Sequence, residues 1–155
     1  MLWNVIATQS DAEALLQQFG NFHDACVKEA HVWTGHWVSE DLAMAVDPTT
    51  RVRLLIQRQF RPLSAIELLF EGVTRFNLAP APENYESIIF EARLVVRDGL
   101  IYWAETGNWE PDSADRDSYT WIAAAAAKWR DATEWLGEAL RYGPIIAPGN
   151  EDAET

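Results

Sequence analysis

The stretch of sequence that decides the fold runs from Glu86 to Thr106 and reads ESIIFEARLVVRDGLIYWAET. Two runs of apolar and aromatic residues flank Asp98-Gly99, a dipeptide suited to the positive φ angles of a short hairpin loop. A loop of this length fixes the strand register, so that Arg97 faces Leu100. One face of the predicted hairpin then collects large apolar side chains, namely Ile88, Phe90, Leu94, Val96, Ile101 and Trp103.

Alternating patterns on the N-terminal side of this hairpin predict further antiparallel strands. We expect them over residues 25–33, 42–46, 51–60, 64–71 and 73–78, with a bend at Gly72. Within 51–60 the even positions are apolar apart from Arg58, which places them on the inner face of the sheet. A free strand edge before the connector Pro80–Pro82 would allow a homodimer to form by edge pairing.

One short helix is expected near the N-terminus, from about Asp11 to Phe19. Ser10 and Glu13 have the spacing of a capping box at its start. Gly20-Asn21 follows the last apolar residue and suits the left-handed geometry that ends many helices.

Residues 121–129 carry two conflicting signals. Ala123–Ala127 has the strongest intrinsic helix propensity in the chain. The segment also alternates from Trp121 to Trp129 as a strand would. A strand is favoured and a helix stays open as the alternative.

These elements predict an α+β domain that is mainly antiparallel β-sheet. We expect about seven to eight strands in a sandwich or a strongly curved sheet, with one short N-terminal helix and room for a second short helix near the C-terminus. Residues 1–143 would form a single globular domain, because cores of this size are common. Residues 144–155 are rich in acidic residues, Pro and Gly, and are expected to form a flexible acidic tail.

The charge balance restricts the partners. The chain has 12 Lys and Arg residues against 24 Asp and Glu residues, which gives a formal net charge of -12. Nucleic-acid affinity comes largely from basic residues that neutralise phosphates, so we expect no nucleic-acid partner. The same charge disfavours anionic membranes, whereas a basic protein partner would be attracted.

Cysteine usage and the N-terminal sequence predict a cytoplasmic location. The lone Cys26 excludes an intrachain disulfide and a zinc site with several cysteines. The N-terminus lacks the basic and apolar segments of a signal peptide, and no apolar run approaches the ~20 residues of a membrane span.

Polar residues in unusual places are the candidates for function. His23 and Asp24 lie at the predicted helix-to-strand junction, and we expect them to contact a ligand or partner. Glu29 and His31 share a strand face at a spacing that suits two metal ligands, but no compact metal motif accompanies them, and we expect no metal.

Arg58 lies among apolar residues on the predicted inner face, so its guanidinium needs a carboxylate or carbonyl partner. A structural ion pair and an anion-binding role are the two interpretations. Trp37 and Trp109 lie in predicted turn or loop segments and are expected to be exposed contact anchors, since tryptophan is enriched in interface hot spots.

The sequence resembles a family of uncharacterised bacterial cytosolic proteins that share an FHD-x-x-(I/V)-K-E segment and a DGLIYW hairpin. The resemblance spans about residues 19–137. The matching segments are Phe22–Glu29, Glu40–Leu42, Ile56–Phe60, Asp98–Trp103, Thr120–Ile122 and Lys128–Arg130. Since the family has no assigned activity, the resemblance implies a shared fold and no mechanism.

No nucleophile–base pairing, phosphate loop, zinc signature or dinucleotide fingerprint is present, and we expect no cofactor. The leading hypothesis is a non-catalytic protein-interaction module with the character of immunity or antitoxin proteins. The alternative is a small-ligand or anion-binding domain that uses Arg58 and aromatic walls. A third hypothesis is a hydrolase that uses carboxylates near Trp103, namely Glu67, Glu71, Glu91 and Glu105.

Overall fold

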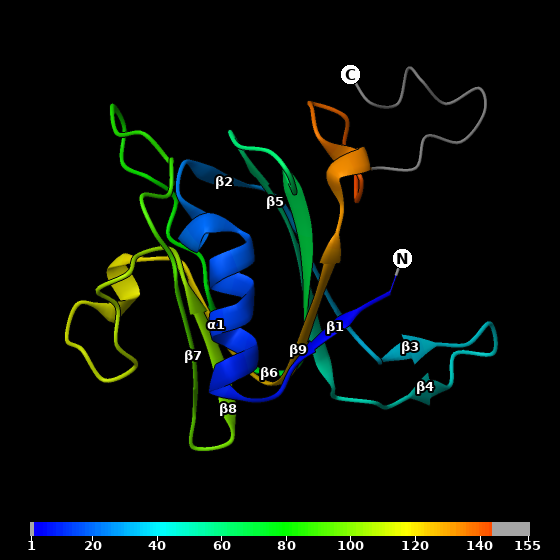
Figure 1. Ribbon diagram of the computed structural model, residues 1–155. Helices are drawn as coiled ribbons and strands as arrows, with labels where there is room; N and C mark the ends of the chain where they lie inside the picture. The colour runs from blue at the N-terminus through cyan, green and yellow to red at the C-terminus, as the bar shows by residue number, and fades with distance from the viewer. Residues whose placement is uncertain (1, 144–155) are drawn as a thin grey trace.

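The computed structural model describes residues 2–143, which form an α+β fold built on antiparallel β-sheet (Figure 1). The main sheet has seven strands in the order β2-β5-β6-β9-β8-β7, with β1 beside β9. Its strands are β1 (Asn4–Ile6), β2 (Ala25–Thr34), β5 (Thr50–Arg58), β6 (Ala65–Asn77), β7 (Arg93–Arg97), β8 (Leu100–Ala104) and β9 (Trp121–Asp131). A separate sheet pairs β3 (Trp37–Val38) with β4 (Met44–Ala45).

Strand β9 joins the two halves of the main sheet. One of its edges pairs with β6 along nearly its whole length, and the other pairs first with β8 and then with β1. The strand prediction for Ala123–Ala127 is therefore confirmed and the helix alternative is wrong. Pairing on both edges outweighs the local helix propensity of alanine, and Ala124 and Ala127 are buried in the main hydrophobic cluster.

The hairpin register is confirmed, but its first strand is shorter than predicted. Arg97 pairs with Leu100 and Leu94 with Trp103, whereas β7 begins only at Arg93. In the preceding segment Ile89 is buried, and Ile88 and Phe90, which were predicted to face the core, are 51% and 76% exposed. The segment before β7 is shifted by one residue from the predicted register. Adjacent residues in an extended chain face opposite sides, so this shift turns Ile88 and Phe90 outward and Ile89 inward.

The backbone of Ile89 explains this register. Its N–H donates to the Ala25 carbonyl at 2.7 Å, and its carbonyl accepts from the Asp24 N–H at 2.9 Å. This antiparallel bridge joins β2, at one end of the sheet order, to the segment before β7, at the other end. The curved sheet is thereby nearly closed at this point.

Helix α1 (Gln9–Gln18) lies against the inner side of the curved sheet (Figure 1). Ala12 and Leu15 are fully buried there, together with Phe19 and with Phe22 in the 3-10 turn η1 (Gly20–Phe22). The predicted capping box is wrong by two residues.

Thr8 and Asp11 make the reciprocal bonds instead of Ser10 and Glu13. Thr8 and Asp11 lie three residues apart, as Ser10 and Glu13 do, so they can form the same motif. The Asp11 carboxylate also accepts the N–H groups of Ala7 and Thr8 at 2.9 and 3.0 Å.

Two other expectations change. The predicted strand over 42–46 is reduced to the short β4, and the predicted strands 64–71 and 73–78 form one strand that continues through Gly72 at a φ of 65°. The free strand edge expected before Pro80 is present: β6 pairs with β9 as far as Asn77 but with β5 only as far as Glu71, so among the described strands one edge of residues 73–77 has no partner. Near the C-terminus the described chain forms the 3-10 turn η3 (Thr133–Trp135). The predicted tail, 144–155, lies outside the described residues.

A buried carboxylate fastens the segment after η3 to the outer face of the sheet. Glu67 on β6 is fully buried and accepts hydrogen bonds from Arg130 at 2.8 Å and from Arg141 at 2.9 Å, and a third from the Tyr142 hydroxyl. Glu29 on β2 accepts the backbone N–H groups of Arg141 and Tyr142. Glu67 thus joins the centre of the sheet to residues 136–143.

The surroundings of Glu67 keep it ionised. Burial by itself would raise the pKa of Glu67, but the Tyr142 hydroxyl and the guanidinium groups of Arg141 and Arg130 outweigh it and lower that pKa. The stabilisation from this ion cluster is therefore complete above the pKa of an unfolded glutamate, about 4.3, and is lost as the pH falls through the lower folded value.

We expect Glu67→Gln to reduce the free energy of unfolding by about 3 kcal/mol at pH 7, because two arginines lose their buried counter-ion. Urea denaturation at pH 7 and pH 3 measures this loss. The difference from the unmodified protein should shrink at pH 3, where Glu67 becomes protonated in the unfolded chain.

Glu71→Gln is the matched control on the same strand. Glu71 is partly exposed and pairs with Arg51 and Lys128 at 3.4 and 3.7 Å, so its loss should cost under about 1 kcal/mol. Equal losses for the two variants at pH 7 would contradict the role assigned to Glu67.

Candidate functional site

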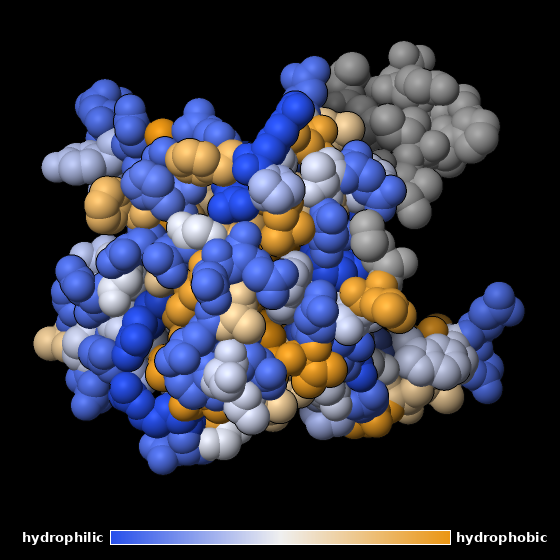
Figure 2. Space-filling view, in the orientation of Figure 1, coloured by the Kyte–Doolittle hydropathy of each residue, from blue (hydrophilic) through white to orange (hydrophobic). Residues whose placement is uncertain are grey.

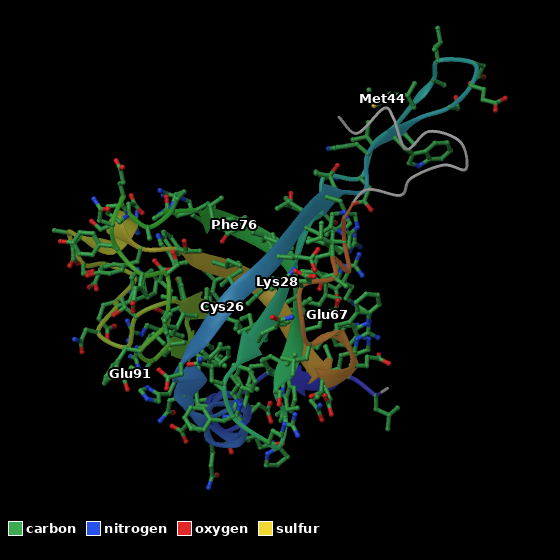
Figure 3. The ribbon with its side chains drawn as sticks, turned by 90° about the horizontal axis from the view of Figure 1, so that it is seen from above. Cys26, Lys28, Met44, Glu67, Phe76 and Glu91 are labelled. Carbon is green, nitrogen blue, oxygen red and sulfur yellow. The ribbon has the colours of Figure 1, made fainter. Side chains whose placement is uncertain are left out.

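The most unusual surface is a two-stranded arm, residues 35–47, which projects from the body of the protein (Figures 1 and 3). Trp37 pairs with Ala45 and Val38 with Met44. Five large apolar side chains of the arm are more than half exposed: Trp37 at 63%, Val38 at 52%, Leu42 at 84%, Met44 at 62% and Val46 at 71%. In the space-filling view the arm on the right mixes hydrophobic and polar side chains (Figure 2).

Hydrogen bonds order the base of this arm. The Gly35 N–H donates to the Asp47 carbonyl at 3.0 Å, and the Asp47 N–H donates to Nδ1 of His36 at 3.2 Å. A side chain at position 35 would collide with the Asp47 carboxylate, so the two chain segments approach closely only because residue 35 is glycine.

The tip of the arm is also ordered. The Ser39 N–H donates to the Ala43 carbonyl at 2.9 Å, and the Leu42 N–H donates to the Ser39 carbonyl at 2.9 Å. The Ser39 hydroxyl also donates to the Asp41 carboxylate. The arm therefore has a defined shape although it has no core of its own.

An apolar arm without a core needs an explanation. An isolated two-stranded hairpin is at best marginally stable in water, and burial of one Val, Leu or Met side chain contributes about 1.5–3 kcal/mol. Scattered apolar residues on a surface are ordinary, but apolar residues gathered on a projecting element mark a contact site. The arm therefore has the features of a surface that is buried against something else.

The arm is acidic as well as apolar. Residues 35–47 contain Glu40, Asp41 and Asp47 and no Lys or Arg. The Ser39 hydroxyl lowers the pKa of Asp41, and the Thr49 hydroxyl lowers the pKa of Asp47. Both carboxylates thus stay charged well below neutral pH, and the arm complements a surface that is apolar and basic.

The structure separates the two tryptophans that were expected to be contact anchors. Trp37 is exposed on the arm. The expectation for Trp109 is wrong, because only 2% of it is exposed. It packs against Trp121 at a ring distance of 5.0 Å, and its indole N–H donates to the Arg116 carbonyl at 3.2 Å. The acidic loop folds back and buries it in a second, smaller hydrophobic cluster.

His23 and Asp24 lie together at the start of β2, far from the arm along the same strand. Nδ1 of His23 is 2.8 Å from the Phe90 carbonyl oxygen, and Nε2 is 3.4 Å from the Asp24 carboxylate. Asp24 has a φ of 56° and immediately precedes the Ala25–Ile89 bridge. Their contacts within the chain position the segment before β7.

Arg58 is bound by backbone carbonyls. Its Nε donates to Leu63 at 2.8 Å, its Nη2 donates to Pro62 at 2.7 Å and to Gln18 at 3.4 Å, and its guanidinium lies over the Phe19 ring at 4.6 Å. The predicted need for a carboxylate or carbonyl partner is confirmed. These bonds join the end of α1 to the loop between β5 and β6, which is a structural role.

Glu29 and His31 are engaged within the chain. Both Glu29 oxygens accept backbone N–H groups of the C-terminal segment, while His31 stacks on Trp33 and lies 3.0 Å from an Arg53 nitrogen. Among residues 2–143 no group of three or more His, Cys, Asp or Glu side chains is placed to hold a metal ion.

The carboxylates near Trp103 divide between two surfaces. Glu67 and Glu71 pair with basic groups on the outer face of the sheet. Glu91 and Glu105 line a cleft on the opposite side. Trp103 is completely buried, so its ring offers no surface on which a sugar would stack.

Sequence reasoning found Trp37 but missed the other apolar residues of the arm, which are Val38, Leu42, Met44 and Val46. The strand predicted over 42–46 rests on the pattern of its apolar residues. Its close acidic neighbours, Glu40, Asp41 and Asp47, were the available signal that the segment is not buried in a core.

Comparisons with family models, with curated proteins and with solved structures found no match to this chain. A functional proposal for this chain therefore rests on the geometry of the structure. Within residues 2–143 no helix combines the length and the apolar character needed to cross a bilayer.

Replacing each tryptophan by alanine tests this surface assignment. We expect Trp37→Ala to change the free energy of unfolding by less than about 0.5 kcal/mol, because its side chain supports no core. Trp109→Ala should cost about 3–5 kcal/mol, because it leaves a cavity in a packed cluster. Urea denaturation measures both, and a large loss for Trp37→Ala would show that the arm is part of the folded core.

Proposed function

We propose that this protein is a non-catalytic interaction module whose arm, residues 35–47, binds another protein. The observation that carries the proposal is the ordered arm with five exposed apolar side chains, among them Trp37 at 63% exposure. Tryptophan is enriched among the residues that dominate binding energy at protein interfaces, and exposed apolar side chains gathered in one place mark a contact site.

Charge indicates the kind of partner. The arm has no Lys or Arg, and the whole chain carries a formal net charge of -12. Repulsion between two such chains disfavours self-association, whereas a basic protein would be attracted and would meet the arm faster. The same charge argues against nucleic acid.

Immunity and antitoxin proteins provide the closest functional type, since they are small acidic chains that neutralise a basic protein by binding it. The encounter would take place in the cytoplasm, where a chain with a single cysteine needs no disulfide. The partner we propose is a basic protein encoded beside this chain.

The test is to express the neighbouring basic protein with this chain, purify both and measure binding by calorimetry. We expect a one-to-one complex whose affinity falls with added salt, because opposite charges meet at the interface. Trp37→Ala and Leu42→Ala should each weaken the complex by about 30-fold or more, the loss typical of a hot-spot residue.

Leu2→Ala is the matched control, since Leu2 is 90% exposed and lies outside the arm. It should leave the affinity unchanged. No complex with the neighbouring protein, or a complex that the arm variants bind equally well, would overturn the proposal. A concentration-dependent dimer that is lost with Trp37→Ala would instead assign the arm to self-association.

A further inference from the structure

A cleft of about 560 Å³ opens where the curved sheet fails to close. Its walls come from β2 and β5, from the end of β6, from the segment between β6 and β7, and from the segment between β8 and β9, which includes Glu105 and Gly107. The Ala25–Ile89 bridge closes the sheet beyond one end of the cleft. In Figure 3, Phe76 and Glu91, which both line the cleft, lie on the part of the molecule remote from the arm. The volume falls in the range of sites for small molecules.

The walls of the cleft are mainly apolar. Val27, Leu54 and Phe76 contribute from the sheet, and Tyr85 and Phe90 contribute from the segment before β7. Tyr85 and Phe90 are 74% and 76% exposed, so much of their apolar surface faces solvent. A ligand with an apolar chain or ring would bury this surface.

All charged residues that line the cleft are acidic. They are Glu86, Glu91 and Glu105, and no Lys, Arg or His side chain lines it. Within residues 2–143 none of the three forms an ion pair, whereas Glu67, Glu71 and Glu110 elsewhere in the fold all pair with arginine.

Glu105 lies deepest of these acidic groups. One of its carboxylate oxygens accepts the Thr120 N–H at 3.0 Å. A backbone N–H carries no net charge, so this bond does not neutralise the carboxylate. Burial raises the pKa of Glu105, because a partly buried carboxylate is less well solvated than one in water. A positive charge in the cleft would offset this cost.

The Glu91 carboxylate is held against Gly107, another residue of the wall. A side chain at position 107 would collide with it, so the carboxylate occupies this place only because residue 107 is glycine. Glu91 therefore adds a second negative charge at the cleft.

We propose that this cleft binds a small organic cation, in which a protonated amine pairs with Glu105 and Glu91 and an attached apolar chain or ring packs against Phe76 and Phe90. This site is independent of the arm, and it differs from the anion site that is the alternative interpretation of Arg58. Arg58 does not line the cleft.

The test compares three probes that share one apolar body: 4-phenylbutylamine, 4-phenylbutanol and 4-phenylbutyrate. Titration of the full chain, followed by nuclear magnetic resonance, should show that the amine binds about tenfold more tightly than the alcohol, because one partly desolvated charge pair forms. The carboxylate should bind most weakly. Equal affinities, a preference for the carboxylate or no binding of any probe would overturn the proposal.

Glu105→Gln locates the site. Glutamine keeps an oxygen that accepts the Thr120 N–H, so the fold is retained while the charge is removed. The amine should then bind no better than the alcohol, whose affinity should not change. Glu91→Gln should also reduce the preference for the amine over the alcohol. Because Glu91 is exposed, this variant should fold, and it tests the site if Glu105→Gln does not fold.

Glu13→Gln is the control, because it removes one charge from the exposed side of α1, outside the cleft. It should leave all three affinities unchanged. If Glu13→Gln weakened amine binding as much as Glu105→Gln did, the amine would be attracted only by the net charge, and the proposed site would be wrong.

Discussion

Pairing on both edges of β9 is the constraint on which the rest of the structure depends. β6 covers one edge of this strand, and β8 and β1 share the other. The sheet can curve around α1 and bring its two ends together at Ala25 and Ile89 only because β9 joins both halves. Backbone groups in the buried centre must be hydrogen-bonded, and these ladders meet that requirement.

This frame also determines which surfaces remain free for function. The inner side is filled by α1, and the outer side near Glu67 is covered by residues 136–143. The turn between β2 and β5 extends beyond the sheet as the arm, and the incomplete closure leaves the cleft. These two regions carry the exposed apolar groups of Trp37 and Phe90. Arg58, the polar residue that looked most unusual in the sequence, donates to the carbonyls of Leu63 and Pro62 in the loop between β5 and β6.

Local patterns were sufficient for much of the fold and for little of the site. The Asp98-Gly99 loop determined the hairpin register, because a short loop leaves one pairing. Ile88 and Phe90 were assigned to the wrong face, because their register depends on a bridge to Ala25, far away in the sequence. Trp109 was predicted to be exposed, because nothing local shows that its loop folds back onto Trp121.

The candidate surfaces depend on spatial arrangement that no short pattern encodes. Glu91 and Glu105 meet at one cleft through the curvature of the sheet, and the arm is visible only once the chain between β2 and β5 is seen to leave the body.

The most direct test of the central claim, that the arm binds another protein, is photo-crosslinking in the native host with p-benzoylphenylalanine in place of Trp37. A crosslink to one basic protein, which the same group in place of Leu2 does not form, is the predicted result. No crosslink to any other protein, or a crosslink only to a second copy of this chain, would contradict it.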